Sequence, residues 1–156
     1  MKTYKEEKVI YQTGEGKKDE AYMITSPIEL MFLDELRKQT EIVSLKNNNY
    51  KFDIKPQWIV EKNNKKYRVD IDLEVIYVNI KDDRYDFYKY YFIECDGYDY
   101  HYRNKKQVTN DRKRERALMN DCHRFLRFTG TEIYKDVKGC VKELLDIVQK
   151  DVGVYV

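Results

Sequence analysis

The sequence predicts an α/β fold, in the form of an α+β sandwich with a mixed central sheet flanked by helices. Segments with apolar residues at helical spacing are interspersed with segments in which apolar and polar residues alternate. Their order is helix, three strands, helix, strand, helix. The strand–helix–strand step in the second half of the chain indicates a right-handed parallel crossover.

The composition predicts one domain with a substantial core, since the chain has 156 residues and 42% of them are hydrophobic. We expect residues 1–24 to form a polar, flexible N-terminal extension with one short strand at residues 8–12, and residues 25–156 to form the single domain. There is no apolar run of membrane-span length and no signal peptide in the lysine-rich start. We therefore expect a cytoplasmic protein with no membrane partner.

The first helix of the domain is predicted from the segment TSPIELMFLDELRK. Ser26 suits the N-cap, Pro27 suits the first helical position, and Glu29 lies three residues after the cap. This pattern predicts a capping box and a helix that ends near Lys38.

Three strands are predicted next. Residues 55–78 form two of them, joined by the turn KNNK, and residues 87–96 return as the third. In the second strand one face is apolar and the other carries Asp70, Asp72 and Glu74. We expect Asp72 and Glu74 to face solvent.

The last third of the chain predicts a helix over about residues 105–120, a strand in HRFLRF, and an amphipathic helix from about residue 131 to 150. Gly139 interrupts this last helix at an expected cost of about 1 kcal/mol relative to alanine.

A possible metal site follows from the carboxylates on these strands. Glu94 and Asp96 are two residues apart and project to the same face, and an antiparallel neighbour would bring Asp70 opposite Glu94. We expect no matching buried bases beside them, and buried carboxylates without a counter-charge are costly. A hard divalent cation, Mg²⁺ or in its place Mn²⁺, would explain the group.

These segments, taken in order, resemble the PD-(D/E)XK nuclease superfamily, and most closely its very-short-patch-repair-like branch of small restriction-endonuclease-like domains. The resemblance covers roughly residues 25–150. It rests on the segments YRVDIDL, YFIECDGYDYH and DRKRERALMNDCHRFLRF. The matching positions are Glu29, Asp70, Glu94, Asp96, Gly97, His101, Asp111, Arg114, Leu118 and 126–128.

The resemblance implies a restriction-endonuclease-like core and a Mg²⁺-dependent endonuclease that hydrolyses phosphodiester bonds in DNA. The implied catalytic residues are Glu29, Asp70, Glu94, Asp96, His101 and Arg114. Within that set Asp70, Glu94 and Asp96 would hold the metal. The chain departs from the superfamily pattern at Asp96, which stands where the characteristic lysine would be, and before the last strand, where the expected glycine is missing.

A basic segment at residues 101–116 holds seven Lys or Arg against two acids. Such a segment is typical of a helix that binds a polyanion, although a solvated helix surface has the same composition. The predicted nucleic-acid contacts are Arg103, Lys105, Lys106, Arg112, Lys113 and Arg116. Gln107 and Asp111 share a helix face with Arg114 and would support the carboxylates from behind; an ordinary surface pair of Asp111 with Arg114 is the alternative.

Several of these residues have a second interpretation. Glu29 is explained equally well by the capping box, Asp70 by an edge strand with Arg68 or Arg84 as its partner, and His101 by a turn.

The function likewise has alternatives. The chain could be a non-catalytic protein of the same fold that regulates or inhibits by binding nucleic acid or protein, or an unrelated α+β domain with a solvated acidic face. As an enzyme of one domain, it would nick DNA, form a homodimer or work with a recognition partner.

Overall fold

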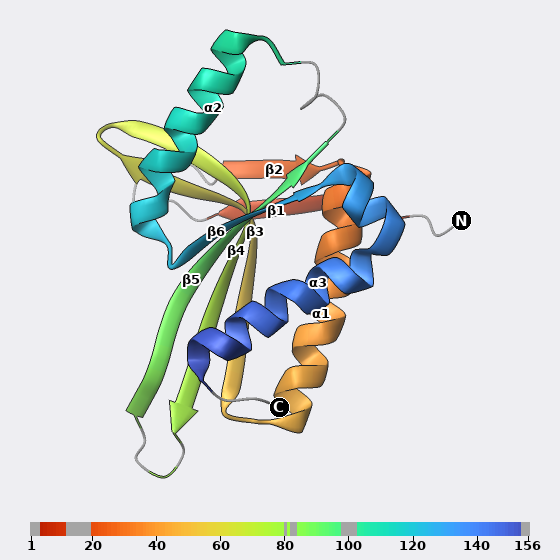
Figure 1. The fold of residues 1–156 in the computed structure, drawn as a ribbon, viewed down its shortest axis with the longest axis vertical. Helices are drawn as coiled ribbons and strands as arrows, with labels where there is room; N and C mark the ends of the chain where they lie inside the picture. The colour runs from red at the N-terminus through yellow and green to blue at the C-terminus, as the bar shows by residue number, and fades with distance from the viewer. Residues whose placement is uncertain (1–3, 12–19, 80, 82–83, 98–102, 154–156) are drawn as a thin grey trace.

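The computed structural model describes residues 4–11, 20–79, 81, 84–97 and 103–153. In this part of the chain a mixed four-stranded sheet, a two-stranded hairpin and three α-helices make an α+β fold (Figure 1). The coarse fold class and the order of elements from residue 25 onward are therefore as predicted.

The elements have the following bounds: β1 Glu7–Tyr11, β2 Glu20–Ile24, α1 Pro27–Lys46, β3 Tyr50–Lys62, β4 Lys65–Asn79, β5 Arg84–Asp96, α2 Lys105–Leu118, η2 Met119–Asp121, β6 Arg124–Thr129 and α3 Gly130–Val152. Here η2 is a single 3₁₀ turn that follows α2.

The sheet has the strand order β3-β4-β5-β6. β3, β4 and β5 are antiparallel neighbours, and β6 runs parallel to β5 after the crossover through α2. The predicted parallel step is confirmed. The predicted turn between β3 and β4 is confirmed too, and it is tight because Asn63 and Asn64 take φ values of 51° and 61°, a region that asparagine tolerates.

The main core lies between the sheet and the pair α1 and α3, which lie side by side (Figure 1). Ile71, Leu73 and Ile93 contribute from the sheet, and Phe32 and Leu144 from the helices. A second, smaller cluster of Val69, Phe92 and Leu118 anchors the C-terminal end of α2 to the sheet. The sheet is thus covered unevenly, and α2 is fixed mainly at one end.

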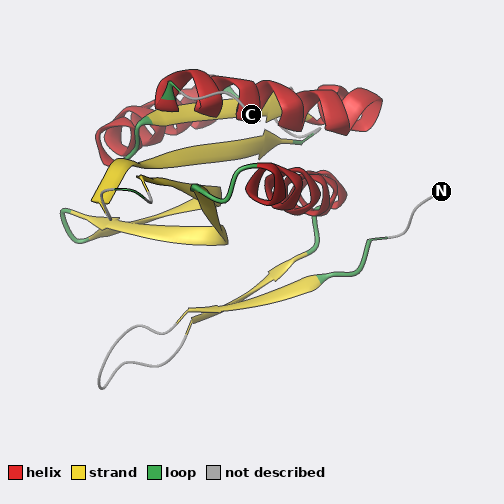
Figure 2. Ribbon diagram, turned by 90° about the horizontal axis from the view of Figure 1, so that it is seen from below, coloured by secondary structure: helices red, strands yellow, loops and turns green. Residues whose placement is uncertain are grey.

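The hairpin of β1 and β2 contributes to the main core. Val9 and Ile24 are buried in it, and Arg37 on α1 donates to both carboxylate oxygens of Glu7 at 2.7 and 2.8 Å. Figure 2 shows the hairpin beyond α1, away from the four-stranded sheet. The strand predicted at residues 8–12 corresponds to β1, whereas β2 was not predicted.

Helix α1 is longer than predicted. It continues past Lys38 to Lys46 because Thr40 is buried on its inner face and Val43 packs against the core, so the apolar stripe extends for two more turns. The prediction that Ser26 closes a capping box with Glu29 is wrong, since the Ser26 side chain makes no capping hydrogen bond.

Helix α3 is kinked at Asp136, whose backbone has φ −158° and ψ 74°. The Asp136 side chain then acts as an internal cap, because its Oδ1 accepts a hydrogen bond of 3.0 Å from the backbone N–H of Gly139. A Cβ atom at position 139 would lie 2.2 Å from Asp136 Oδ2. Gly139 therefore makes room for the cap and is not a flaw in the helix.

None of the described helices is both long and apolar enough to cross a membrane.

Candidate active site

The pairing of β4 with β5 brings Asp70 and Glu94 together. Ile71 is opposite Ile93, so the next pair along the antiparallel ladder is Asp70 with Glu94. Asp70 Oδ2 accepts a hydrogen bond of 2.8 Å from the backbone N–H of Cys95. The Glu94 side chain is buried, with 7% of the residue exposed. The buried carboxylate of Glu94 and the half-buried carboxylate of Asp70 thus lie side by side in the sheet.

Glu29 reaches the same position from the first turn of α1. It is 6% exposed and accepts a hydrogen bond from Gln57 Nε2 instead of capping its own helix. Burial, followed by the negative charge of Asp70, raises the pKa of Glu29 to about 7. The structure thus contradicts the capping interpretation of Glu29 and places its side chain beside Gln57 and near Asp70.

Gln57, the hydrogen-bond donor to Glu29, has a left-handed backbone with φ 53° in the middle of β3. The β3–β4 register runs from the pair Pro56–Ile71 to the pair Trp58–Val69, so Gln57 is the counterpart of Asp70. A non-glycine residue in this conformation is strained, and such strain is typical of functional sites.

The carboxyl group of Glu94 also has a raised pKa. Burial is the main cause, the charge of Asp70 is the second, and Arg114 opposes both. Asp70 therefore acts electrostatically on two neighbours, Glu29 and Glu94. We refer to these three residues, Glu29, Asp70 and Glu94, as the acid cluster.

Arginines provide the counter-charges around the acid cluster. Arg114 on α2 donates through Nη2 to Glu94 and to the backbone carbonyl of Arg68. Arg127 on β6 holds Asp96 with two hydrogen bonds of 2.9 Å. The expectation that the carboxylates lack matching buried bases is therefore wrong.

Arg127 also links the sheet to α2. Its guanidinium donates to Asp111 at 2.9 Å and to Glu115 at 3.0 Å. Hydrogen bonding to Asp96 raises the pKa of Arg127 further above its usual range, so the group stays charged. Both Asp96 oxygens accept hydrogen bonds from this guanidinium, whereas Asp70 accepts from the backbone N–H of Cys95 and Glu94 accepts from Arg114.

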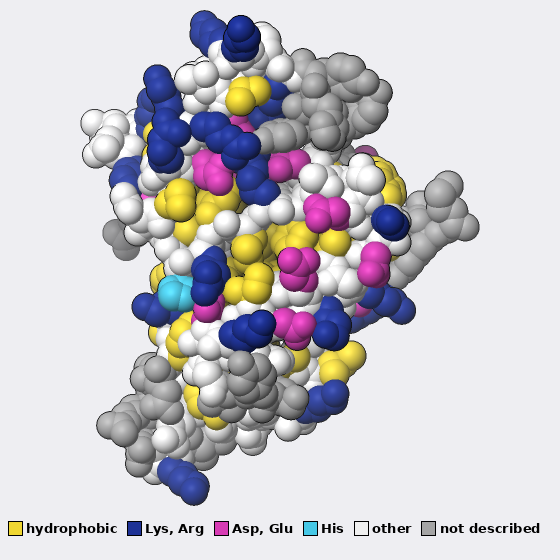
Figure 3. Space-filling model, in the orientation of Figure 1, with side chains coloured by type: hydrophobic (Ala, Val, Ile, Leu, Met, Phe, Trp, Pro, Cys, Tyr) yellow, Lys and Arg dark blue, Asp and Glu magenta, His cyan; other side chains and the backbone are white. Residues whose placement is uncertain are grey.

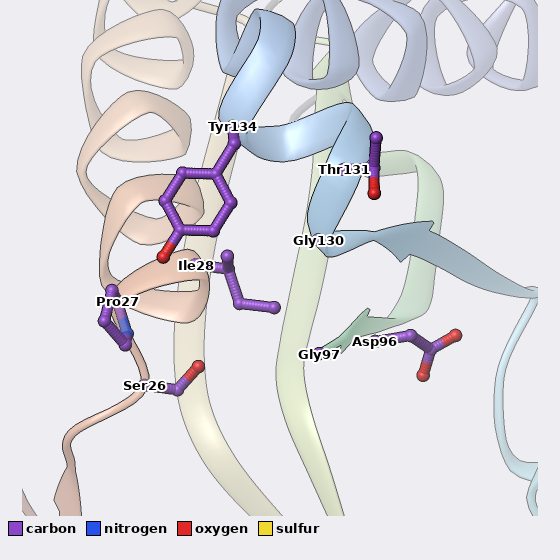
Figure 4. A pocket seen from close by; sticks show the side chains of 8 residues that line it. All are labelled: Ser26, Pro27, Ile28, Asp96, Gly97, Gly130, Thr131 and Tyr134. Atoms are coloured by element: carbon purple, nitrogen blue, oxygen red, sulfur yellow. The ribbon is translucent and has the colours of Figure 1, made fainter. Parts of the chain in front are cut away.

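Two members of the acid cluster, Asp70 and Glu94, line a polar cavity of about 350 Å³. Carboxylates and arginines alternate around it; the lining residues are Asp70, Glu94, Cys95, Asp96, Gly97, Arg103, Asp111, Arg114 and Arg127. A second cavity, of about 320 Å³, shares Asp96 and Gly97 with the first and is lined mainly by the N-terminal ends of α1 and α3 (Figure 4). A bound molecule could therefore contact both sides of the Asp96–Gly97 backbone.

The predicted supporting residues on α2 divide into two kinds. Asp111 lines the cavity, 2.9 Å from Arg127, 3.5 Å from Arg103 and 3.8 Å from Arg114. Gln107 does not join it. It is exposed and forms the capping box of α2 with Asn104, so the prediction that it supports the carboxylates is wrong.

Basic side chains gather on the exposed surface of α2, the dark blue group at the top of Figure 3. The predicted nucleic-acid contacts Lys105, Lys106, Arg112, Lys113 and Arg116 are all exposed there, and Arg103 lies just before the helix. Arg112 also pairs with Glu115 at 2.9 Å. His101 lies outside the described residues.

The expectation that Asp72 and Glu74 on β4 face solvent is wrong, because both residues are buried. Glu74 accepts a hydrogen bond of 2.9 Å from Lys55 and another from the Tyr88 hydroxyl. Asp72 is 1% exposed, and burial raises its pKa to about 7. The second face of β4 is thus covered along most of its length by aromatic and charged side chains.

Within the described residues, no group of three or more His, Cys, Asp or Glu side chains is arranged as a metal site. Asp70 and Glu94 nevertheless provide two hard oxygen ligands, and Mg²⁺ commonly binds through one or two carboxylates and several waters. A cation beside Asp70 would also relieve the repulsion that raises the pKa values of Glu29 and Glu94. The residues present therefore fit a hard divalent ion.

The sequence interpretation missed two residues of the site. Arg127 stands between the inward-facing Leu126 and Phe128, so the period of two along β6 places it on the Glu94 side of the sheet. This signal was available in the sequence. No comparable signal exists for Gln57, whose role depends on its unusual backbone conformation.

Comparison of the chain with protein-family models, with curated proteins and with solved structures finds no match.

Proposed function

We propose that this chain is a metal-dependent endonuclease that hydrolyses phosphodiester bonds in DNA and acts in the cytoplasm. The acid cluster is the observation that carries the proposal. Three acids from α1, β4 and β5 are brought together against their own repulsion, and two of them, Asp70 and Glu94, line a polar cavity with arginines in its walls. The order of helices and strands agrees with the restriction-endonuclease-like core that the sequence resembles.

Asp70 and Glu94 would hold the metal, Mg²⁺ or Mn²⁺. When bound, the ion would polarise the scissile phosphate and lower the pKa of an attacking water. We assign Asp96 a different role from the metal ligand first expected. Because both of its oxygens bind Arg127, it positions this arginine at the cavity wall.

The remaining residues supply proton handling and charge. Glu29 has a pKa of about 7, which lets it accept or donate a proton near neutral pH. Arg114 lines the cavity and would neutralise charge on the phosphate. The exposed lysines and arginines of α2 would hold neighbouring phosphates of the DNA backbone.

Cleavage of supercoiled plasmid and of single-stranded DNA tests the proposal, with Mg²⁺, with Mn²⁺ and with EDTA. We expect metal-dependent cleavage by the wild type and a loss of at least about 100-fold in Glu94→Gln and in Asp70→Asn. Glu143→Gln, the same change at an exposed position of α3, serves as the matched control and should keep full activity. Absence of cleavage under every metal condition would contradict the proposal.

One observation favours a second function, a non-catalytic regulator on the same scaffold. Arg114 and Arg127 already pair with Glu94 and Asp96, so part of the acidic charge is compensated by the protein itself. Such a protein would show neither cleavage nor any rise in thermal stability on addition of Mg²⁺ or Mn²⁺. The enzyme should be stabilised by the ion, because a ligand that binds only the folded state raises the melting temperature.

A further inference from the structure

A buried acid on the second face of β4 lacks a hydrogen-bond donor. Asp72 is 1% exposed, and its Oδ1 has no hydrogen-bond partner among the described residues. A buried acceptor without a partner costs about 1–3 kcal/mol, and more when it is charged. A donor from outside this part of the chain would recover that free energy.

Asp72 lines a cavity of about 310 Å³ that is separate from the acid cluster. Its walls are largely aromatic and aliphatic and its opening is acidic; the lining residues are Lys55, Trp58, Ile59, Val60, Glu61, Asp72, Tyr90, Phe92 and Asp121. A water molecule could satisfy Asp72 Oδ1 but would fill little of the cavity between the apolar walls. A ligand with a flat apolar face and several N–H donors would satisfy both.

The lysines at this cavity are already engaged. Lys55 Nζ donates to Glu74 at 2.9 Å and lies 4.7 Å from the centroid of the Trp58 ring. Lys62 Nζ, at the end of β3, donates to the Ala117 carbonyl at 3.0 Å and to Asp121 at 3.3 Å. Asp72 Oδ1 thus receives no hydrogen bond from either lysine, although the charge of Lys55 acts on Asp72, and Glu61 adds an exposed acid at the opening.

We infer that this cavity binds a guanidinium group, presented as an arginine side chain of a partner protein. A guanidinium is planar and stacks on aromatic rings, and its fork of N–H donors matches a carboxylate. Asp121 at the opening already pairs with Lys62 at 3.3 Å, and the exposed acid Glu61 favours a basic polypeptide and disfavours a nucleic acid. The inference is independent of the proposed nuclease activity.

Trp58 gives a direct measurement, because it is the only tryptophan in the chain and it lines the cavity. The experiment follows its fluorescence during titration of the full chain with the blocked peptide acetyl-Gly-Arg-Gly-amide. We expect a saturable change. Acetyl-Gly-Lys-Gly-amide should bind at least about fivefold more weakly, since an ammonium lacks the planar fork.

Two further ligands test whether the cavity prefers an arginine within a polypeptide to free arginine, and whether it binds a nucleotide instead. Free L-arginine carries an α-carboxylate that the acidic opening repels, so it should bind more weakly than the blocked peptide; tighter binding of free arginine would overturn the assignment to a partner protein. Saturable binding of guanosine monophosphate in preference to the peptide would overturn the guanidinium assignment and indicate a nucleotide.

Variants locate the binding. Asp72→Asn should weaken peptide binding by at least about tenfold, and Asp146→Asn, an exposed member of an ion pair with Lys142 on α3, should leave it unchanged. Glu61→Gln at the exposed opening tests the site without disturbing the interior and should weaken binding about two- to threefold. No saturable response in the wild type, or equal binding by wild type, Asp72→Asn and Glu61→Gln, would refute the inference.

Discussion

Two carboxyl groups, those of Glu29 and Asp72, hold their protons to an unusually high pH because both are buried beside other acids. Each has a pKa of about 7, well above the value of about 4 in an unfolded chain. Between these two values the folded protein binds more protons than the unfolded one. Its stability must therefore fall as the pH rises through this interval.

We predict that the free energy of unfolding decreases between pH 5 and pH 8, by about 2 kcal/mol for each of the two groups, since one pKa unit corresponds to about 1.4 kcal/mol. Urea unfolding at several pH values measures this. Glu29→Gln and Asp72→Asn should each flatten the dependence, whereas the exposed Glu143→Gln should not. A stability that rises over the same interval in the wild type would contradict the assigned burial.

Arg127 takes part in three ion pairs of the site. It bridges Asp96, Asp111 and Glu115, so its removal takes away both hydrogen bonds that hold the partly buried Asp96 and one partner each of Asp111 and Glu115. We predict that Arg127→Met lowers the free energy of unfolding by about 3 kcal/mol or more. Arg127→Lys should recover less than half of this, because an ammonium cannot form the two-bond contact with Asp96.

Chemical denaturation measures these losses, and Arg112→Lys provides the control, since Arg112 is an exposed arginine of α2 that pairs with Glu115 at 2.9 Å. A loss below about 1 kcal/mol in Arg127→Met would show that the carboxylates find other partners.

At the scale of single residues, the sequence predicted the acids better than their partners. Strand alternation was enough to place Asp70 beside Glu94, but it predicted solvated positions for Asp72 and Glu74, because the side chains that surround these acids come mainly from the neighbouring strands. The same limitation explains Glu29. Capping is a local pattern, whereas its bond to Gln57 spans 28 residues.

At the scale of elements, the kink in α3 changes the expected effect of a glycine substitution. In a regular helix Gly139→Ala would stabilise the protein by about 1 kcal/mol. Here the added methyl group would displace the Asp136 carboxylate from its capping position, so we predict a loss of about 1 kcal/mol. Thermal unfolding measures the difference, and Lys138→Ala, at the exposed neighbouring position, should be close to neutral. Stabilisation by Gly139→Ala would show that the cap is unimportant.

Element boundaries were predicted best where local chemistry defines them. The Asn63–Asn64 turn fixes the hairpin of β3 and β4, and period-two alternation locates β4 and β6. The end of α1 was set eight residues too early, at Lys38 instead of Lys46, because the polar residues that follow hide the inward-facing Thr40 and Val43. Strand β2 was missed because only its pairing with β1 defines it.

For the whole molecule, the concentration of positive charge on α2 predicts how DNA binding depends on salt. Each lysine that contacts a phosphate releases a counterion, so the slope of log K against log salt reports the number of contacts. We predict that Lys105→Gln, Lys106→Gln and Lys113→Gln together reduce this slope by about 2–3 for duplex DNA. Fluorescence anisotropy at several salt concentrations measures it.

The matched control replaces three exposed lysines on other elements, Lys38, Lys51 and Lys142, with glutamine. Because the net charge changes equally, any difference between the two triple variants arises from the position of the charge. Equal slopes in the two variants would mean that α2 does not form the binding surface.

The position of the acids in the sheet has a consequence for folding. One line of opposing positions crosses the sheet from β3 through β4 and β5 to β6. It holds Gln57, Asp70, Glu94 and Arg127. A slip of one residue in any strand would turn that strand's member of the line to the opposite face. Misaligned but compact forms of this protein would therefore lose the site completely. On refolding, the recovery of activity would be a more sensitive measure of correct strand alignment than the recovery of secondary structure would be.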